Sequence, residues 1–132
     1  MPERQDEPPV PWPEAAPGEH VYLSYAYLNA RDYDAFASLL ELDAVVSVPG
    51  EMPACGRAAV VAAERRRRFR YSIQDLWIAQ GRIVTTGVLY RQEGCARGVD
   101  FADICMMSAY GLIASRRTYI SASPTEGTLT SG

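Results

Sequence analysis

The chain has 132 residues, of which 48% are hydrophobic, and a formal net charge of −3 at pH 7. This length and apolar content suit a single domain with its own core, and the negative charge gives no general attraction to nucleic acid or to an anionic membrane. No apolar run approaches the roughly 18 residues of a membrane-spanning helix, and the beginning of the chain is acidic and proline-rich, unlike a secretory signal. We therefore expect a cytoplasmic protein with neither nucleic acid nor membrane as a partner.

The two ends of the chain differ in composition from its middle. Residues 1–17 contain six of the nine prolines and several acidic residues, which is typical of a disordered arm. Residues 122–132 are rich in serine, threonine and glycine and are predicted to form a flexible tail. A single folded domain is therefore expected over residues 18–121.

Helical spacing of apolar residues indicates the first elements of this domain. Val21, Tyr25 and Leu28 recur at i, i+4 and i+7. This period predicts a first helix over 19–30. A second helix is predicted to begin at Asp32, whose side chain suits an N-cap.

The chain then changes from helical to strand composition. A short strand over 44–48 ends at a Pro-Gly pair, and a third helix is predicted over 57–69. Four strands are predicted to follow, at 72–79, 82–92, 97–107 and 112–120. Helices first and an antiparallel meander afterwards indicate an α+β domain, and a curved sheet covered by helices leaves a concave face for a ligand.

Asp103 is the most informative residue of the predicted sheet. Strand alternation places it on one face with Phe101, Cys105 and Met107. Burying its charge among these side chains would cost several kcal/mol unless the carboxylate is paired, protonated or exposed to a wet cavity. Asp103 therefore marks either a pocket or a salt bridge.

The last predicted hairpin provides a partner for Asp103. If the chain turns at residues 109–110, Arg116 lies opposite Asp103, and a slip of one residue places Arg117 there instead. An arginine would favour the ionised carboxylate, whereas apolar neighbours would favour the neutral acid. A paired Asp103 suits a general base, and an unpaired one suits a general acid.

Four short stretches carry a resemblance to a known family. They are residues 28–34 (LNARDYD), residues 43–49 (DAVVSVP), Gly56 at the start of a helix, and the hairpin over 99–113. In this order they resemble the nuclear-transport-factor-2-like superfamily, especially its SnoaL-like polyketide cyclase and ketosteroid isomerase branches. The resemblance covers residues 18–121 and implies three N-terminal helices packed on a curved, mainly antiparallel sheet, a cone-shaped barrel with one pocket.

The resemblance also implies roles for individual residues. Asp103 matches the acidic residue of a late strand that faces the pocket, where isomerases use a protonated carboxyl as an oxyanion donor. Four further residues fall on pocket positions of the family, namely Val88, Tyr90, Arg116 and Thr118.

Three residues depart from the family's enzymes. Ser24 and Val48 stand where the isomerases carry a tyrosine and a general-base aspartate, so a steroid-type isomerase is not expected. SnoaL-like cyclases often pair a late-strand aspartate with a histidine, but the only histidine, His20, begins the first helix and is predicted to lie on the surface. Without a histidine partner, epoxide-opening ether cyclisation is favoured over aldol cyclisation.

We therefore expect a cofactor-independent cyclase of a secondary-metabolite, polyketide-like pathway that acts on an apolar small molecule by acid–base catalysis. Besides Asp103, the candidate catalytic residues are Asp75, which shares a strand face with Trp77, and Tyr90. The residues expected to bind substrate are Tyr25, Trp77, Val88, Phe101, Cys105, Met107, Arg116 and Thr118. The alternative is a non-catalytic ligand-binding or dimerisation module of the same fold, and the resemblance implies a homodimer through the outer face of the sheet.

Two residue types argue against other classes of site. Cys55, Cys95 and Cys105 are odd in number and form no C-x-x-C pair, so neither a disulfide framework nor a metal site is expected. The arginines at 65–68 and Arg70 lack interleaved aromatic residues, so a solvated helix end is favoured over a nucleic-acid site. We expect no metal and no cofactor.

Overall fold

The structure, a computed structural model, describes residues 15–91 and 97–121. The helices are α1 (Ala15–Asn29), α2 (Tyr33–Ala37) and α3 (Arg57–Arg67), and the strands are β1 (Leu40–Ser47), β2 (Ala54–Cys55), β3 (Arg70–Ala79), β4 (Arg82–Tyr90), β5 (Val99–Met107) and β6 (Ile113–Ile120). The predicted arm and tail fall outside the described residues, apart from residues 15–17, which belong to α1. No helix in the described ranges has the length and apolar character needed to cross a membrane.

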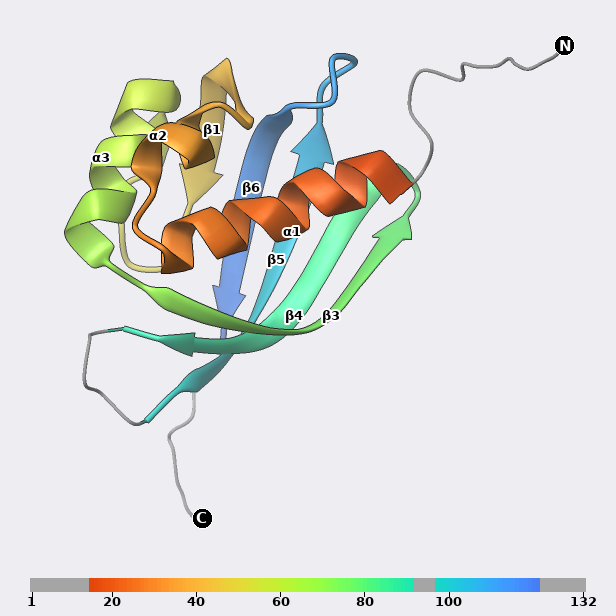
Figure 1. Ribbon diagram of the computed structural model, residues 1–132. Helices are drawn as coiled ribbons and strands as arrows, with labels where there is room; N and C mark the ends of the chain where they lie inside the picture. Colours follow the sequence, from red (N-terminus) through yellow and green to blue (C-terminus); the bar gives the residue numbers. More distant parts are fainter. Residues whose placement is uncertain (1–14, 92–96, 122–132) are drawn as a thin grey trace, which may run out of the picture.

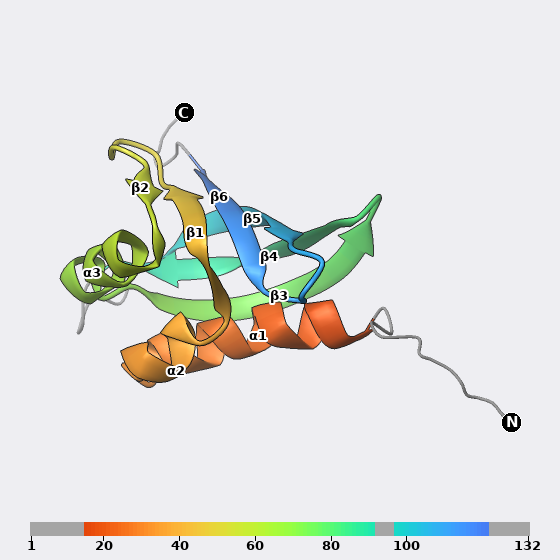
Figure 2. The ribbon, with the colours of Figure 1, turned by 90° about the horizontal axis from the view of Figure 1, so that it is seen from above.

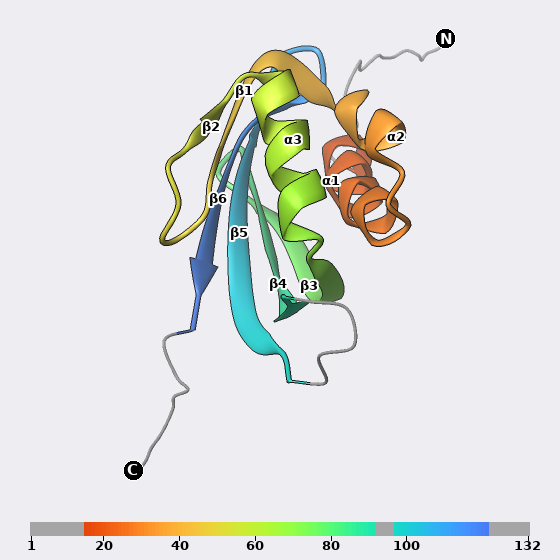
Figure 3. The same ribbon diagram turned by 90° about the vertical axis from the view of Figure 1, so that its left-hand side faces the viewer.

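The six strands form one curved sheet in the order β2-β1-β6-β5-β4-β3. Every neighbouring pair is antiparallel except β1 with β6. In Figure 1, α1 crosses one face of the sheet, and α2 and α3 lie near one end of α1, next to β1. Figures 2 and 3 show the sheet curving around the helices, with all three helices on the same side of β5 and β6. The expected α+β architecture is confirmed, but the sheet remains open between β2 and β3 and does not close into a barrel.

The core lies between α1 and the concave face of the sheet. Val21, Tyr25 and Leu28, the residues at helical spacing, are all buried there. Asp32 is the N-cap of α2, because its side chain accepts a hydrogen bond of 3.1 Å from the backbone nitrogen of Ala35. These features of α1 and α2 agree with the sequence analysis.

The second helix is short because the chain joins the sheet earlier than expected. β1 begins at Leu40, whereas the sequence predicted a strand only over 44–48. The backbone nitrogen of Ile113 in β6 donates to the carbonyl oxygen of Leu39 at 2.8 Å, and Leu40 lies opposite Ile113. Pairing with a strand more than 70 residues away thus extends β1, and local helical spacing cannot reveal such pairing.

Two irregularities in strand pairing decide which side chains face the interior. In the β5–β6 hairpin the register shifts between Met106 and Met107, so Arg116 lies opposite Cys105 and Thr118 lies opposite Asp103. The predicted pairing of Asp103 with Arg116 was therefore wrong by two residues, and the slip that would bring Arg117 opposite Asp103 does not occur either.

The second irregularity lies in β3. The register with β4 shifts between Ile73 and Asp75, so that Asp75 pairs with Thr86 and Leu76 pairs with Thr85. Because strand side chains alternate and Thr85 is buried on the concave side, Asp75 belongs to the convex face. Trp77, two residues further along β3, shares that parity.

Gly87 permits the close approach of β3 and β4 at this bulge. A Cβ atom at Gly87 would collide with the carbonyl oxygen of Ser72 and lie 3.1 Å from the Cα of Ile73. Only glycine fits there without moving a backbone, because the obstructing atoms belong to the main chain.

Gly87→Ala should lower the free energy of unfolding by about 2 kcal/mol, since β3 must shift to accommodate the methyl group. Urea denaturation measures this change. Thr86→Ala, on the opposite face of the same strand, is the control and should cost less than about 1 kcal/mol. Equal stability of Gly87→Ala and the unmodified protein would contradict the close approach.

Candidate functional site

Asp103 lies at the centre of β5 on the concave face, directly below α1. Its side chain is 0% exposed. Thr85 of β4 and Thr118 of β6 flank it in a row across three strands, and both threonines are buried. The carboxylate therefore lines the interior of the fold and is separated from bulk solvent.

Two hydroxyl groups bind the Asp103 carboxylate. Tyr25 of α1 donates its phenolic hydrogen to Oδ2 at 2.6 Å, and Thr118 donates to Oδ1 at 2.5 Å. Each carboxylate oxygen thus has a donor from a different element, one from the helix and one from the neighbouring strand. These bonds replace the water that the carboxylate loses on burial.

A chain of alternating charges extends from Asp103 towards α3. Nε of Arg116 lies 3.9 Å from Oδ2 of Asp103, and Nη2 of Arg116 donates to Oε2 of Glu64 at 2.6 Å. Arg67 contacts the same Glu64 oxygen at 3.0 Å and reaches Glu51 at 3.0 Å. Since Glu64 and Arg116 are only 2% and 3% exposed, each buried charge needs the opposite charge beside it.

Burial and these charges change the pKa values of the interior groups. Burial, reinforced by the negative charge of Asp103, raises the pKa of Tyr25 well above its ordinary value, so its hydroxyl keeps the proton that it donates. Burial alone would lower the pKa of Arg116, but Glu64, Tyr71 and Asp103 outweigh that effect and hold the pKa above its ordinary value. Burial raises the pKa of Cys105 to about 12, which leaves a neutral thiol.

Aromatic rings surround this polar cluster. The ring centroids of Tyr25 and Tyr71 are 5.1 Å apart, and those of Tyr71 and Phe101 are 5.5 Å apart. The guanidinium of Arg116 lies 5.7 Å from the centroid of Tyr25 and 5.8 Å from that of Phe36. The rings exclude water from the cluster and add cation–π attraction to the charge of Arg116.

The structure brings together seven of the eleven residues that the sequence analysis selected. Four of them, Tyr25, Arg116, Thr118 and Asp103, form direct contacts with one another. Three more share the concave face of β5 with Asp103, namely Phe101 and Cys105, which are buried, and Met107, which is partly buried at the strand end.

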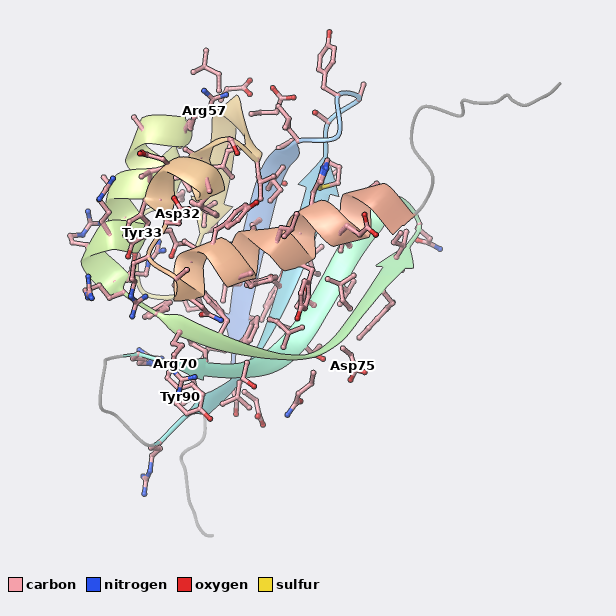
Figure 4. All side chains as sticks on the ribbon, in the orientation of Figure 1. Asp32, Tyr33, Arg57, Arg70, Asp75 and Tyr90 are labelled. Carbon is pink, nitrogen blue, oxygen red and sulfur yellow. The ribbon has the colours of Figure 1, made fainter. Side chains whose placement is uncertain are left out.

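The remaining selected residues lie elsewhere. Asp75 projects from the convex side of the sheet, away from α1, and so do Tyr90 and Arg70 (Figure 4). Tyr90 and Val88 pair with Arg70 and Ser72, on the opposite parity from the buried Leu89. The expectation that Asp75 and Tyr90 would join Asp103 was therefore wrong, because the bulge in β3 and strand alternation in β4 turn them outward.

The sequence analysis missed two buried polar residues of this region, Thr85, which is paired with Asp103, and Glu64, which reaches it through Arg116. Glu64 of α3 follows Val60 and Ala63 at helical spacing, on the buried face of that helix. This spacing is visible in the sequence, but a glutamate in an arginine-rich helix is usually exposed. Thr85 alternates with the buried Ile83 along β4 and could have been recognised in the same way.

The arginines between residues 65 and 70 mostly serve contacts within the protein. Arg65 lies over the ring of Tyr33 at 4.7 Å, and Arg70 lies over the ring of Tyr90 at 4.4 Å. Arg67 belongs to the charge chain described above. Most of these arginines are exposed, as expected of a solvated helix end, whereas Arg67 is not.

Two hollows lie along the seam between α1 and β3. The larger, about 760 Å³, is called here the α1–β3 groove and is lined by Gly18, Glu19, Tyr22, Leu23, Leu76, Trp77 and Ile78. The smaller, about 160 Å³, is lined by Tyr22, Tyr25, Ala26, Asn29, Tyr71 and Ile73. Tyr22 borders both hollows, and Tyr25 connects the smaller one to Asp103.

No group of three or more histidine, cysteine, aspartate or glutamate side chains is placed to hold a metal ion within residues 15–91 and 97–121. The polar cluster around Asp103 consists of hydroxyl, carboxylate and guanidinium groups. The α1–β3 groove provides mainly apolar and aromatic surface.

Solved structures share this fold. An NTF2-like protein of unknown function from Cytophaga hutchinsonii is 13% identical, with a TM-score of 0.73 over 82% of this chain and 92% of that chain. A candidate ketosteroid isomerase from Kribbella flavida is 14% identical, with a TM-score of 0.72 over 83% and 80% of the two chains. An orange carotenoid protein from Anabaena is 22% identical, with a TM-score of 0.70 over 81% of this chain and 36% of that one.

These similarities identify the architecture as the NTF2-like fold, in agreement with the superfamily that the sequence resembles. The Kribbella flavida protein is described as a candidate ketosteroid isomerase, whereas the SnoaL-like branch is not distinguished. No family model matches the chain, and no curated protein matches it.

Asp103→Asn should lower the free energy of unfolding by about 2 to 4 kcal/mol, because it removes one charge from a buried chain of alternating charges. Urea denaturation monitored by circular dichroism measures the effect. Asp100→Asn, at an exposed position of the same strand, is the matched control and should change stability by less than about 0.5 kcal/mol. Equal effects of the two substitutions would contradict a stabilising role for Asp103.

Proposed function

We propose that this protein binds an apolar small molecule in the α1–β3 groove, and that Asp103 stabilises the interior beneath the groove without reacting with the ligand. The observation that carries the proposal is that the carboxylate of Asp103 is already fully bound by other groups of the protein. Both of its oxygens accept hydrogen bonds from protein hydroxyls, and the side chain has no exposed surface. A general acid or base must reach its substrate directly or through one water, and this carboxylate is already satisfied within the fold.

The groove has the properties of a small-molecule site. Its volume of about 760 Å³ lies within the usual range of roughly 300 to 1,000 Å³ for ligand pockets. Leu23, Leu76 and Ile78 supply aliphatic surface, and Tyr22 and Trp77 supply aromatic surface. Among proteins of similar fold, the Anabaena orange carotenoid protein binds canthaxanthin, which supports an apolar ligand for this fold.

A second candidate function is acid–base catalysis, as in the cyclase hypothesis. Two buried polar atoms next to Asp103, Oγ1 of Thr85 and Nε of Arg116, have no hydrogen-bond partner among the described residues. A small polar group of a substrate entering beside Tyr25 could bind them. If Asp103 is catalytic, Asp103→Asn should lower the turnover number by orders of magnitude. If the protein only binds a ligand, the same variant should keep its affinity.

The proposed groove can be tested with a neutral apolar dye such as N-phenyl-1-naphthylamine. The dye should bind saturably, and Ile78→Glu should weaken its binding by about tenfold or more, because the ligand would then contact a charge in an apolar site. Leu42→Glu is the matched control, since Leu42 is 73% exposed and lies outside the groove. Absence of saturable binding, or equal affinity in both variants, would contradict the proposal.

We also propose that two copies associate through the convex face of the sheet, as the family resemblance implies. Met106 of β5 and Tyr119 of β6 have convex parity and are about half exposed. Ile104, two residues before Met106 on β5, has the same parity. Sedimentation velocity should give the mass of a dimer, and Met106→Glu should give that of a monomer because a charge would enter the apolar contact. A monomeric unmodified protein at about 100 μM would contradict this association.

A further inference from the structure

We infer that the ligand of the α1–β3 groove carries a positively charged nitrogen on an apolar body, as in an alkyl or aryl ammonium compound. This inference rests on the proposed function and adds the chemical class of the ligand. The observation behind it is the juxtaposition of one carboxylate with two aromatic side chains in an otherwise aliphatic groove.

Glu19 is the charged residue of the groove lining. It makes no hydrogen bond or ion pair with any part of the chain that the structure describes. Two other acidic side chains, Glu64 and Glu51, are by contrast paired with arginines. Within the described ranges, no basic side chain competes for the carboxylate of Glu19.

The aromatic residues of the groove favour the same ligand. Tyr22 follows Glu19 by three residues on α1, so both project from neighbouring positions of one helix face. Trp77 has convex parity on β3, but because β3 is the edge strand of the sheet it also borders the groove, and it is 46% exposed. The faces of tyrosine and tryptophan rings attract cations, and this attraction adds to that of a nearby carboxylate.

Other head groups fit the groove less well. A carboxylate or phosphate would be repelled by Glu19 and by the net charge of −3. A neutral ligand would bury part of Glu19 without compensating its charge. The aliphatic residues Leu23, Leu76 and Ile78 then hold the apolar body of the molecule, whichever head group it carries.

The test uses three probes with the same tail, decyltrimethylammonium, decanol and decanoate, each below its aggregation concentration. Trp12→Phe leaves Trp77 as the single tryptophan of the chain, so its indole N–H peak in a proton–nitrogen NMR spectrum reports binding in the groove. Decyltrimethylammonium should bind about five- to tenfold more tightly than decanol, and decanoate should bind most weakly.

Glu19→Gln should remove the preference for the ammonium probe and leave the affinity for decanol unchanged. Asp43→Asn, at an exposed position of β1 outside the groove, is the control and should preserve the preference. Equal affinity for the ammonium and alcohol probes in the unmodified groove would overturn the ligand class while leaving groove binding intact.

Two other outcomes would also decide against the inference. If no probe shifts the Trp77 peak at millimolar concentration, both the groove function and the ligand class are wrong. If the peak shifts on dilution or on removal of residues 1–13, without any probe, then a second copy or the N-terminal segment occupies the groove, and the ammonium ligand is overturned.

Discussion

Burial of the Asp103 charge is the constraint that determines the arrangement of the interior. An unpaired carboxylate at this depth would cost several kcal/mol. The hydroxyls of Tyr25 and Thr118 and the guanidinium of Arg116 offset this cost, and they come from α1 and β6. The position of α1 over the sheet is therefore fixed by a specific hydrogen bond as well as by burial of its apolar face.

The same charges connect the sheet to α3. Arg116 is shared between Asp103 and Glu64, and Glu64 in turn pairs with Arg67 of α3. With its charges neutralised in pairs and aromatic rings packed around them, the interior is largely complete without a ligand. The α1–β3 groove is one of the places where apolar surface remains accessible, and it is where we propose that the ligand binds.

The sequence predicted the elements better than their registration. Periodicity located α1 and its buried Tyr25, and strand alternation placed Asp103 on the interior face. It could not predict the shift that brings Thr118 opposite Asp103 or the bulge that turns Asp75 outward. Bulges depend on how two distant segments fit together, as the clash at Gly87 with β3 illustrates, and such fits leave little trace in one segment alone.

The hydroxyl proton of Tyr25 provides the most direct measurement of the central claim that Asp103 is closed within the fold. If Tyr25 donates to a buried Asp103, this proton should exchange slowly with water, appear as a separate NMR resonance, and show a coupling to the carboxyl carbon of Asp103. The resonance should disappear in Tyr25→Phe. A Tyr25 hydroxyl proton that exchanges as fast as that of the exposed Tyr22 would contradict the claim and would favour an Asp103 accessible to substrate.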